Sequence, residues 1–522
     1  MHTSTRSITA SRTVGRRALL GALATIPLGA AIAANAGQAR AEGPGLVIDV
    51  RDRGAAGDGI TDDGPAIRAA VEEVAAAGGG TVRIPAGDYR LASPTPLNGN
   101  PAGYGFGREL VNLRSGVRIE GAGQDRVRLI VGEWTPTAWV VFRGIRVHDA
   151  GITGVTIHNT AVDPADTSYF DVVFLKSCTD MEISYNGTYD VIGWQFDLNI
   201  TADGLENAPP EEWGRRIHVH DCRFTSLTEF HQHHDMLVEN CQWDIDKAYP
   251  RPQWLGGNAT QTAFKVSGKN AVQRNVTVRN SRIDVTGTGK PISLFEVWRG
   301  QDVTIHNLTT TGQAETTSRI NSAWEKGPGT ASIATQVRFE ACDFESFRLA
   351  LGEGHQVEFD RCTFDNRPYA FPGEVIRDDV DPTRQQSPTP IPTSLHLAHC
   401  ELLGGGTLLR TAHKPSTVTS LVHCTLEHDE SVAPTSLDWY GEELELVHTR
   451  LVALGTTTSQ AIRSRGRGKV RFVHSNAVTA NGAEIAKDTV RLSGAHLSVR
   501  FVHSRLPHVT APDFSGSLRR VG

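Results

Sequence analysis

Val337–Phe344 reads Val-Arg-Phe-Glu-Ala-Cys-Asp-Phe, and Val357–Phe364, twenty residues later, reads Val-Glu-Phe-Asp-Arg-Cys-Thr-Phe. Apolar and polar residues alternate in both copies, which is the pattern of a strand with one buried face. The alternation breaks just before the cysteine, so each copy predicts two short strands joined by a tight turn. Short strands that recur about every twenty residues predict an all-β solenoid, a parallel β-helix. A β-propeller would need about forty residues per blade and hairpin turns, which the sequence lacks.

The cysteine position of this repeat recurs along the chain as a slot for small residues. Six of the seven cysteines fill it, and Ser, Thr or Asn fill it in other copies. Disulfides would need isolated, matched pairs, and a metal site would need clusters such as Cys-x-x-Cys, which the sequence lacks. We therefore expect buried, unpaired thiols that stack from coil to coil. From residue 222 onward, the slot falls at residues 222, 241, 281, 308, 342, 362, 400, 424, 449, 475 and 504.

One stretch of the chain predicts a helix. Asp62-Asp63-Gly64-Pro65 precedes the apolar stripe at residues 66–77, and three glycines at 78–80 end it. An Asp cap followed by an early Pro is typical of a helix start. A solenoid needs its first coil covered, so we expect this helix to be the cap. The acidic residues of the segment, Asp58 included, are interpreted as turn and cap residues rather than as catalytic carboxylates.

Two segments beside this helix resemble a known family. Ile48–Asp63 reads Ile-Asp-Val-Arg-Asp-Arg-Gly-Ala-Ala-Gly-Asp-Gly-Ile-Thr-Asp-Asp, and Ile84–Tyr89 reads Ile-Pro-Ala-Gly-Asp-Tyr. With the helix between them, they resemble the opening segment of the pectate-lyase-like superfamily of right-handed parallel β-helix proteins, of the rhamnogalacturonase/epimerase-like kind. The resemblance implies a single-stranded right-handed parallel β-helix and a secreted carbohydrate-active protein.

The resemblance does not identify a subfamily or a reaction. The same opening is found in polygalacturonases, rhamnogalacturonases, mannuronan epimerases, glucanases and phage tail spikes. The Asn-Thr-Asp and Gly-His-Gly motifs of the polygalacturonases are absent, as is the Tyr-Gly-Phe-Asp-Pro-His motif of the epimerases.

The first 41 residues have the pattern of a targeting segment. Two adjacent arginines precede a mild apolar run from Ala18 to Ala34, and a small-x-small cleavage pattern ends at Ala41. This is typical of a twin-arginine-type signal peptide. We therefore expect residues 1–41 to direct export and to be removed. The secreted protein would then have an N-terminal cap with the first strands at 42–92 and a parallel β-helix with long loops at 93–522.

The charge of the chain limits its partners. The formal charge is −6, from 52 Lys and Arg against 58 Asp and Glu. The first 41 residues hold five arginines and no acid, so the remainder carries −11. An acidic body is a poor nucleic-acid binder. No other stretch approaches the roughly 18 apolar residues of a membrane span, so we expect no membrane partner after signal removal. The oligomeric state is not predicted by any pattern in the sequence.

The strand before each repeat copy forms a further parallel sheet, and we expect the active site on its outer face. With Phe196, Phe230, Phe264 and Phe295 inward, the alternate residues point outward. Neighbouring coils are about 4.8 Å apart, so these residues form a row of charged groups. The expected catalytic residues are Lys265, Glu229, Glu296 and His231, and the expected substrate-binding residues are Asp197, Trp298, Arg319, Arg348 and Trp254.

Two features beside the row bear on its interpretation. Long insertions bring Trp213, Trp243 and Trp254, and aromatic walls around charged groups suit sugar rings. The alternative interpretation is a ladder of exposed, mutually paired charges without a function. The stretch His231–Asp235 is the other candidate site. Strand alternation sends residues 231 and 233 to one side and His234 into the turn, so we expect no metal site there.

Several mechanisms fit the row. A polysaccharide lyase that cleaves a uronate-containing glycan by β-elimination would use Lys265 or His231 as the base. It would neutralise the uronate with Arg319, Arg348, or a calcium ion held by Asp197 and Glu229, which is the one cofactor considered.

An inverting glycoside hydrolase would instead use Glu229 and Glu296, about 10 Å apart. An epimerase or transferase, and a non-catalytic binding or spike-like protein, are the remaining alternatives. We favour the lyase because Lys265 lies between two acids, and in each case the expected partner is a polysaccharide.

Overall fold

The computed structural model divides the chain into two units, Met1–Gly43 and Pro44–Gly522. The segment interpreted as a signal peptide, residues 1–41, lies outside the described residues. The described residues are 45–96, 108–131, 139–160, 170–189, 196–197, 210–225, 228–246, 261–268, 272–287, 292–312, 317–321, 334–352, 354–367, 374–378, 393–404, 407–411, 417–428, 435–454, 460–464, 468–483, 490–506 and 509–521.

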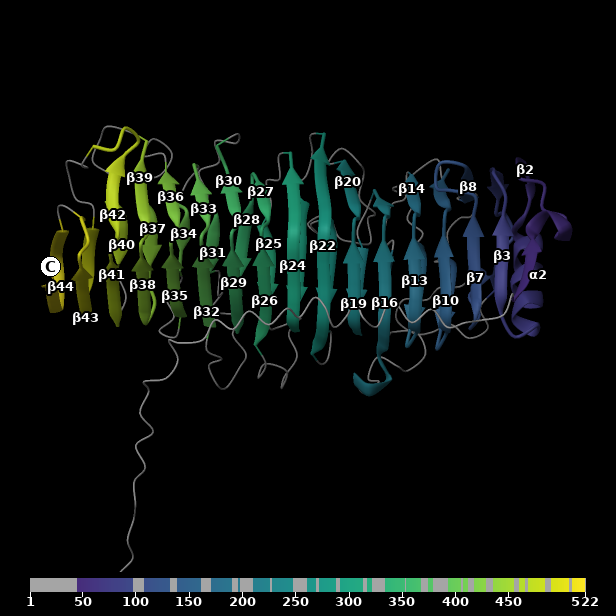
Figure 1. The fold of residues 1–522 in the computed structure, drawn as a ribbon, viewed down its shortest axis with the longest axis horizontal. Coiled ribbons are helices and arrows are strands. Elements are labelled where there is room, and N and C mark those ends of the chain that lie inside the picture. Colours follow the sequence, from purple (N-terminus) through teal and green to yellow (C-terminus); the bar gives the residue numbers. More distant parts are fainter. Residues whose placement is uncertain are drawn as a thin grey trace, which may run out of the picture. The chain divides into compact units, whose positions relative to one another are not determined.

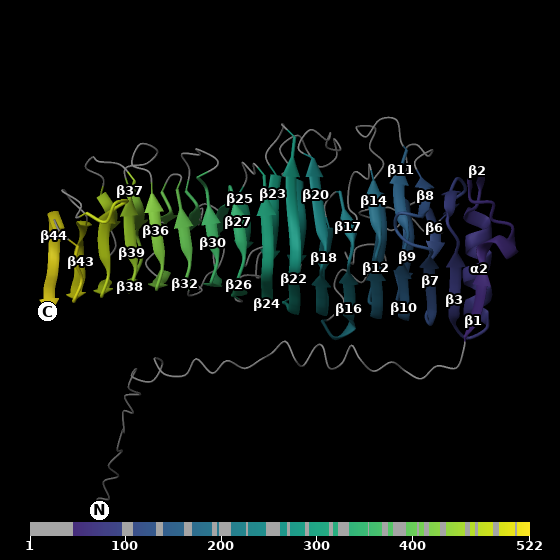
Figure 2. The same ribbon diagram turned by 45° about the horizontal axis from the view of Figure 1, so that its top comes forward.

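The second unit is a right-handed parallel β-helix, which confirms the fold predicted from the repeat (Figure 1). Its coils stack from the helix α2 (Gly64–Ala76) at one end to β44 (Val509–Val521) at the other. Figure 2 shows the same stack turned about its long direction. No helix in the described ranges is long and apolar enough to cross a membrane.

Each coil contributes strands to three parallel sheets. Sheet 1 contains β1 (Leu46–Asp49), β3 (Gly80–Ile84), β7 (Val117–Gly121), β10 (His148–Thr153), β13 (Thr179–Ser184), β16 (Gly214–His220), β19 (His233–Glu239), β22 (Gln273–Thr286), β24 (Gly300–Thr311), β26 (Thr335–Glu340), β29 (His355–Asp360), β32 (Thr393–Ala398), β35 (Thr417–Val422), β38 (Glu443–Val447), β41 (Lys469–Val473), β43 (Val490–Val502) and β44. Of these, β22 and β24 continue into sheet 2, and β43 and β44 begin in sheet 3.

Sheet 2 follows sheet 1 across a tight turn. It contains β2 (Asp58–Asp62), β4 (Gly87–Arg90), β8 (Val127–Val131), β11 (Thr156–Asn159), β14 (Gly187–Tyr189), β17 (Arg223–Phe224), β20 (Gln242–Asp246), β27 (Asp343–Glu345), β30 (Thr363–Asp365), β33 (Glu401–Leu403), β36 (Thr425–His428), β39 (Arg450–Ala453) and β42 (Asn476–Thr479).

Sheet 3 completes the coil and carries the candidate site. It contains β6 (Arg108–Asn112), β9 (Trp139–Ile145), β12 (Phe170–Lys176), β15 (Phe196–Asp197), β18 (Thr228–His231), β21 (Gln261–Ser267), β23 (Ile292–Trp298), β25 (Thr317–Asn321), β28 (Arg348–Leu351), β31 (Ile376–Asp378), β34 (Leu409–Arg410), β37 (Thr435–Trp439) and β40 (Gln460–Ser464). The short β5 (Thr95–Pro96) pairs antiparallel with β6, and 3-10 helices lie at Val50–Arg53 and Pro210–Glu212.

The turn between sheets 1 and 2 explains the small-residue slot. The residue before the slot has a positive φ, as at Asn240 (54°) and His423 (54°), so the chain bends there and the slot side chain points inward. Inside, several slot side chains reach the coil before them; Thr449 Oγ1, for example, donates to Leu421 O at 3.0 Å. All seven cysteines are buried and free, which confirms that they form no disulfides.

The helix α2 covers the first coil, as predicted. Its buried face packs against the 3-10 helix at Val50–Arg53 and against β3 and β6. Asp63 occupies the N-cap position, but its carboxylate accepts from the backbone N–H groups of Ala56 (2.6 Å) and Gly57 (3.2 Å) instead of the helix. The Asp62 carboxylate accepts from Gly64 N–H at 3.2 Å, so the two acids are structural, as interpreted from the sequence.

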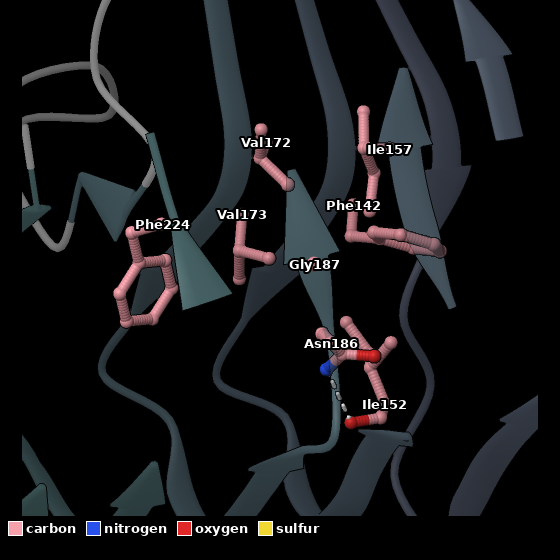
Figure 3. Close-up of a pocket in the computed structure, with 8 residues that line it drawn as sticks. All are labelled: Phe142, Ile152, Ile157, Val172, Val173, Asn186, Gly187 and Phe224. Atoms are coloured by element: carbon pink, nitrogen blue, oxygen red, sulfur yellow. Dashed lines mark hydrogen bonds between the residues drawn. The ribbon is translucent and has the colours of Figure 1, made fainter. Parts of the chain in front are cut away.

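The interior is packed with aliphatic side chains and a stack of aromatic rings. Phe264 and Phe295 stack with their centroids 5.7 Å apart beneath the candidate site. A cavity of about 10 Å³, shown in Figure 3, lies among apolar side chains near β12 and β14. The Asn186 amide at its edge is satisfied, because Nδ2 donates to Ile152 O at 2.9 Å and Oδ1 accepts from Val155 N–H. A space of this size holds about one water molecule, so it is a packing gap and not a substrate site.

Candidate active site

Five adjacent strands of sheet 3 bring the predicted charged residues into one row. In the parallel register Asp197 pairs with Glu229, Glu229 with Lys265, Lys265 with Glu296, and Glu296 with Arg319. The alignment predicted from the sequence is therefore confirmed for these five positions, which we call the central charge row. Figure 2 labels β18, β23 and β25 in the stack, and β21 pairs with both β18 and β23 and so lies between them.

The packing beneath the row fixes the direction of its side chains. Phe230, Phe264 and Phe295 are fully buried in the core, so the alternate residues of β18, β21 and β23 face outward. Trp243 Nε1 donates to Thr228 Oγ1 at 2.8 Å inside the core, directly before Glu229. This hydrogen bond fixes the start of β18 and with it the place of Glu229.

Glu229 joins two basic side chains. Its Oε1 lies 3.2 Å from Lys265 Nζ and its Oε2 lies 3.3 Å from His231 Nε2. The Glu229 and His231 side chains are each 1% exposed, whereas Lys265 is 14% exposed. The alternative of an exposed charge ladder is therefore wrong for this group. Lys265 is its most accessible member, held between a buried carboxylate and the next coil.

Glu296 and Trp298 form the next part of the site. Trp298 Nε1 donates to Glu296 Oε2 at 3.0 Å, and both side chains are half-buried. Trp298 lies opposite Ser267 in the register, and Ser267 lies opposite His231, so Trp298 is two coils from His231. The pair places an aromatic ring and a carboxylate beside Lys265, which is an arrangement suited to a sugar ring with polar substituents.

The two predicted arginines have different surroundings. Arg319 is exposed and continues the row beyond Glu296. Arg348 lies on the following coil but pairs with Thr317, and Ala350 takes the place opposite Arg319. The Arg348 guanidinium contacts Glu374 at 3.3 Å, and Glu374 also binds Arg410 at 2.7 Å. Arg348 is therefore displaced by two residues from the row expected from the sequence.

The pKa of Glu374 indicates that this carboxylate holds neighbouring arginines in place. Burial acts to raise the pKa of Glu374, but the hydrogen bond from Arg410 and the positive charge of Arg377 keep this pKa below its usual value. Glu374 thus stays ionised and holds Arg348 and Arg410 together on the outer face of sheet 3.

Two of the three tryptophans predicted to wall the site, Trp213 and Trp243, lie within the described residues. Trp243 is a core residue with no exposure, stacked between Phe224 and Phe264, so its prediction as a wall is wrong. Trp213 is 2% exposed and stacks on His234 at 5.0 Å. Trp254 and the side chain of Asp197 lie outside the described residues, and only the backbone position of Asp197 is known.

The histidine stretch after β18 is divided by a turn. Gln232 has a φ of 54°, so His231 ends one strand and His233 begins the next, and the predicted shared face of residues 231 and 233 is wrong. Burial lowers the pKa of His233 to about 4, and its Nδ1–H donates to His231 O at 2.6 Å. His234 Nδ1 accepts from Arg274 N–H at 3.1 Å. In the described parts of the chain no group of three or more His, Cys, Asp or Glu could hold a metal ion.

The described part of the site offers few oxygen ligands for the calcium ion considered at Asp197 and Glu229. Calcium prefers six to eight oxygen ligands, about 2.3–2.6 Å away. The described neighbours of the Glu229 oxygens are the nitrogens of Lys265 and His231. We therefore derive no step that depends on calcium.

One residue of the site was missed in the sequence. Lys176 ends β12 just before the turn residue Ser177, as His231 ends β18 just before Gln232, and its side chain has no exposure. Extending the strand alignment by one coil beyond Asp197 would have found it, because Val-Val-Phe-Leu-Lys places a lysine at the end of an apolar strand. Lys176 therefore places a buried amine one coil beyond Asp197, on the strand next to the row.

The comparisons with known proteins agree with this fold. The family described as Rhamnogalacturonase A/epimerase, pectate lyase-like matches residues 47–344. Mannuronan C5-epimerase AlgE3 of Azotobacter vinelandii is 47% identical over 88 residues, which are 16% of this chain and 4% of that protein. Alginate lyase 7 of the same organism is 39% identical over 116 residues, 22% of this chain and 12% of that protein. The chain thus matches only a small part of these relatives.

A solved structure shares the fold. It is a variant tailspike protein of E. coli bacteriophage HK620 in complex with pentasaccharide, with a TM-score of 0.50 and 12% identity, covering 89% of this chain and 78% of that chain. At this identity the likeness concerns the fold alone. Because the family match spans more than half of the sequence, the chain belongs to the Rhamnogalacturonase A/epimerase, pectate lyase-like family.

Proposed function

We propose that the protein is a polysaccharide lyase that cleaves a uronate-containing glycan by β-elimination. The observation that carries the proposal is the contact of Glu229 with both Lys265 and His231 on the outer face of sheet 3. The partial similarity to mannuronan epimerases and an alginate lyase supports a uronate polymer as the substrate. The sequence pattern of residues 1–41 supports an extracellular place of action, after twin-arginine export.

The chemistry follows from the positions of the basic groups. Lys265, as the accessible member, removes the proton from C5 of the uronate, next to the carboxylate. The C–H electron pair becomes the double bond between C4 and C5, and the bond from C4 to O4 breaks. Lys265 accepts the C5 proton as a neutral amine, and the Glu229 carboxylate, 3.2 Å away, stabilises the ammonium that forms. The ammonium then gives this proton to O4 as O4 leaves, which restores the neutral amine. Arg319 stabilises the negative charge of the uronate.

An inverting glycoside hydrolase is the second candidate. Its specific support is the register that puts Glu229 and Glu296 two coils apart, a separation of about 9.6 Å that leaves room for a water molecule. Against it stands the contact of Glu229 with two basic side chains, because a carboxylate held in this way is poorly suited to donate a proton.

The test is a panel of polyuronates and neutral polysaccharides, with unsaturated ends and reducing ends followed separately. We expect a polyuronate to give both kinds of end, and Lys265→Ala to abolish both. Arg83→Ala removes an exposed cation of β3 on sheet 1, in the first coils, and is the control, with activity unchanged. Reducing ends without unsaturated ends would support the hydrolase and exclude the lyase.

A further inference from the structure

The last coils carry a charge opposite to that of the rest of the chain. Residues 446–522 contain twelve Lys and Arg against three Asp and Glu, a formal charge of +9. The whole chain carries −6, so the other 445 residues carry −15. In Figure 1 the strands β41 to β44 form the end of the stack opposite α2. Like charges gathered at one end repel each other, so this end favours a partner of negative charge.

Two rows of arginines concentrate this charge on the surface. On sheet 1, Arg471, Arg500 and Arg519 are partners in the parallel register. On sheet 2, Arg450 pairs with Asn476, which forms a bridge with Arg505. All five guanidinium side chains are exposed. The two rows flank the same turn between sheets 1 and 2, so their charges act on one surface.

A row of stacked histidines lies on the turn between the arginine rows. His399, His423, His448, His474 and His503 each occupy the positive-φ position, and all five are exposed. Successive ring centroids are 5.4, 4.8, 4.9 and 5.1 Å apart, with interplanar angles between 2° and 11°. We call these five residues the histidine ladder.

The geometry of the ladder does not suit a metal ion. Parallel rings one coil apart hold their nitrogens about as far apart as the coils, near 4.8 Å. A metal ion needs each nitrogen at roughly 2.0–2.1 Å, with the two bonds at an angle. The ladder instead repeats one exposed, protonatable group on each coil.

We propose that the five exposed arginines and the histidine ladder form a binding surface for an anionic polysaccharide, separate from the central charge row. A polymer that carries one carboxylate per sugar would meet one basic group per coil along the stack. The half-buried side chains of Val447, Val473 and Val502 lie beside the ladder and offer apolar contact to the faces of the sugar rings. The choice of a polyuronate as the polymer rests on the proposed function.

The charged groups around the ladder are mostly cationic. Asp360 contacts His399 at 3.2 Å and also pairs with Arg361, and Glu445 pairs with Arg471. Glu401 is exposed beside His399 on sheet 2, in the row that continues through Thr425 to Arg450, and Arg450, Arg500 and Arg505 are further charged neighbours.

The experiment measures binding of the full chain to a polyuronate by affinity electrophoresis, with Lys265→Ala present throughout so that the polymer is not cut. Arg500→Ser/Arg505→Ser should weaken binding roughly fivefold, the effect of two exposed ion pairs. The matched control, Arg83→Ser/Arg126→Ser, removes two exposed arginines from the first coils and should leave the affinity unchanged. High salt should weaken binding, because it screens the contacts between exposed charges.

Equal affinity of the two double variants for the polyuronate would overturn the proposed binding surface. Equal affinity for double-stranded DNA or for anionic lipid vesicles would overturn the choice of a polysaccharide. The binding assay tests only the proposed surface, because every protein in it carries Lys265→Ala. The lyase proposal is tested separately, by product analysis of the unmodified protein, so a failure of one proposal can be told from a failure of the other.

Discussion

The central charge row and the histidine ladder use the same coil repeat in opposite ways. The row alternates acids and bases, and Glu229 is buried between Lys265 and His231. The ladder repeats one residue type in the open, and its rings contact mainly each other. Parallel register creates a row wherever one position repeats from coil to coil. Burial and the order of charges decide whether that row becomes a reactive cluster or a binding surface.

The largest expected difference concerns stability. Glu229→Ala should lower the free energy of unfolding by about 3–5 kcal/mol, because it removes the carboxylate from a buried ion pair. Glu445→Ala is the control, since its pair with Arg471 is exposed and should contribute under about 1 kcal/mol. Denaturant unfolding of both variants measures the two values. Equal losses would contradict the contrast between buried and exposed pairs.

The second expected effect is a dependence of stability on acid. The pKa of His233 is lowered by burial to about 4, whereas an unfolded histidine titrates near 6.5. The unfolded chain therefore takes up the proton first. The stability present above about pH 6.5 should fall by roughly 3 kcal/mol as the pH drops toward 4.

His233→Gln should flatten this part of the pH profile, measured by thermal unfolding between pH 7 and pH 4. The exposed His448→Asn serves as the control and should leave the slope unchanged. A slope that persists in His233→Gln would assign the acid sensitivity to other groups.

The third effect separates function from stability. Lys265→Ala should reduce turnover of the polyuronate by at least about 100-fold, the contribution of a positioned base. Glu296→Gln should have a smaller effect in a lyase and a comparable one in a hydrolase. The measurement is the initial rate at which each variant forms unsaturated product. A near-native rate in Lys265→Ala would show that Lys265 is not the catalytic base.

The smallest effect is expected at the ladder. His448→Asn should change the free energy of unfolding by less than about 0.5 kcal/mol, as for most exposed substitutions. Asn occupies the same positive-φ position at Asn280 and Asn307, so the backbone tolerates it. A loss above about 1 kcal/mol in thermal unfolding would show that ring stacking stabilises these coils.

The fold and the central charge row could be predicted because both depend on backbone periodicity. Strand alternation determines which side faces inward, and the small-residue slot gives the register from coil to coil. Glu229, Lys265 and Glu296 could therefore be aligned without knowledge of the loops.

The failures arose where periodicity carries no information. The turn at Gln232 is made by an ordinary residue in an unusual conformation, so the histidine stretch looked continuous. Trp243 follows the slot by two residues, an inward position, but its place beside a long insertion suggested a wall. Arg348 was misplaced by two residues because counting back from the slot assumes loops of equal length. The burial of Glu229 depends on neighbouring coils and could not be read from its own strand.

The positive-φ turns between sheets 1 and 2 have a consequence for how such a protein can change over time. Each turn sets the register of its coil locally, on the side of the stack away from the outer face of sheet 3. The loops that lead into and out of sheet 3 can therefore lengthen, shorten or be exchanged while Glu229, Lys265 and Glu296 stay aligned. Under the proposed function, substrate range and chemistry would thus be separable, because a new glycan could be accommodated by loop replacement while the central charge row stays unchanged.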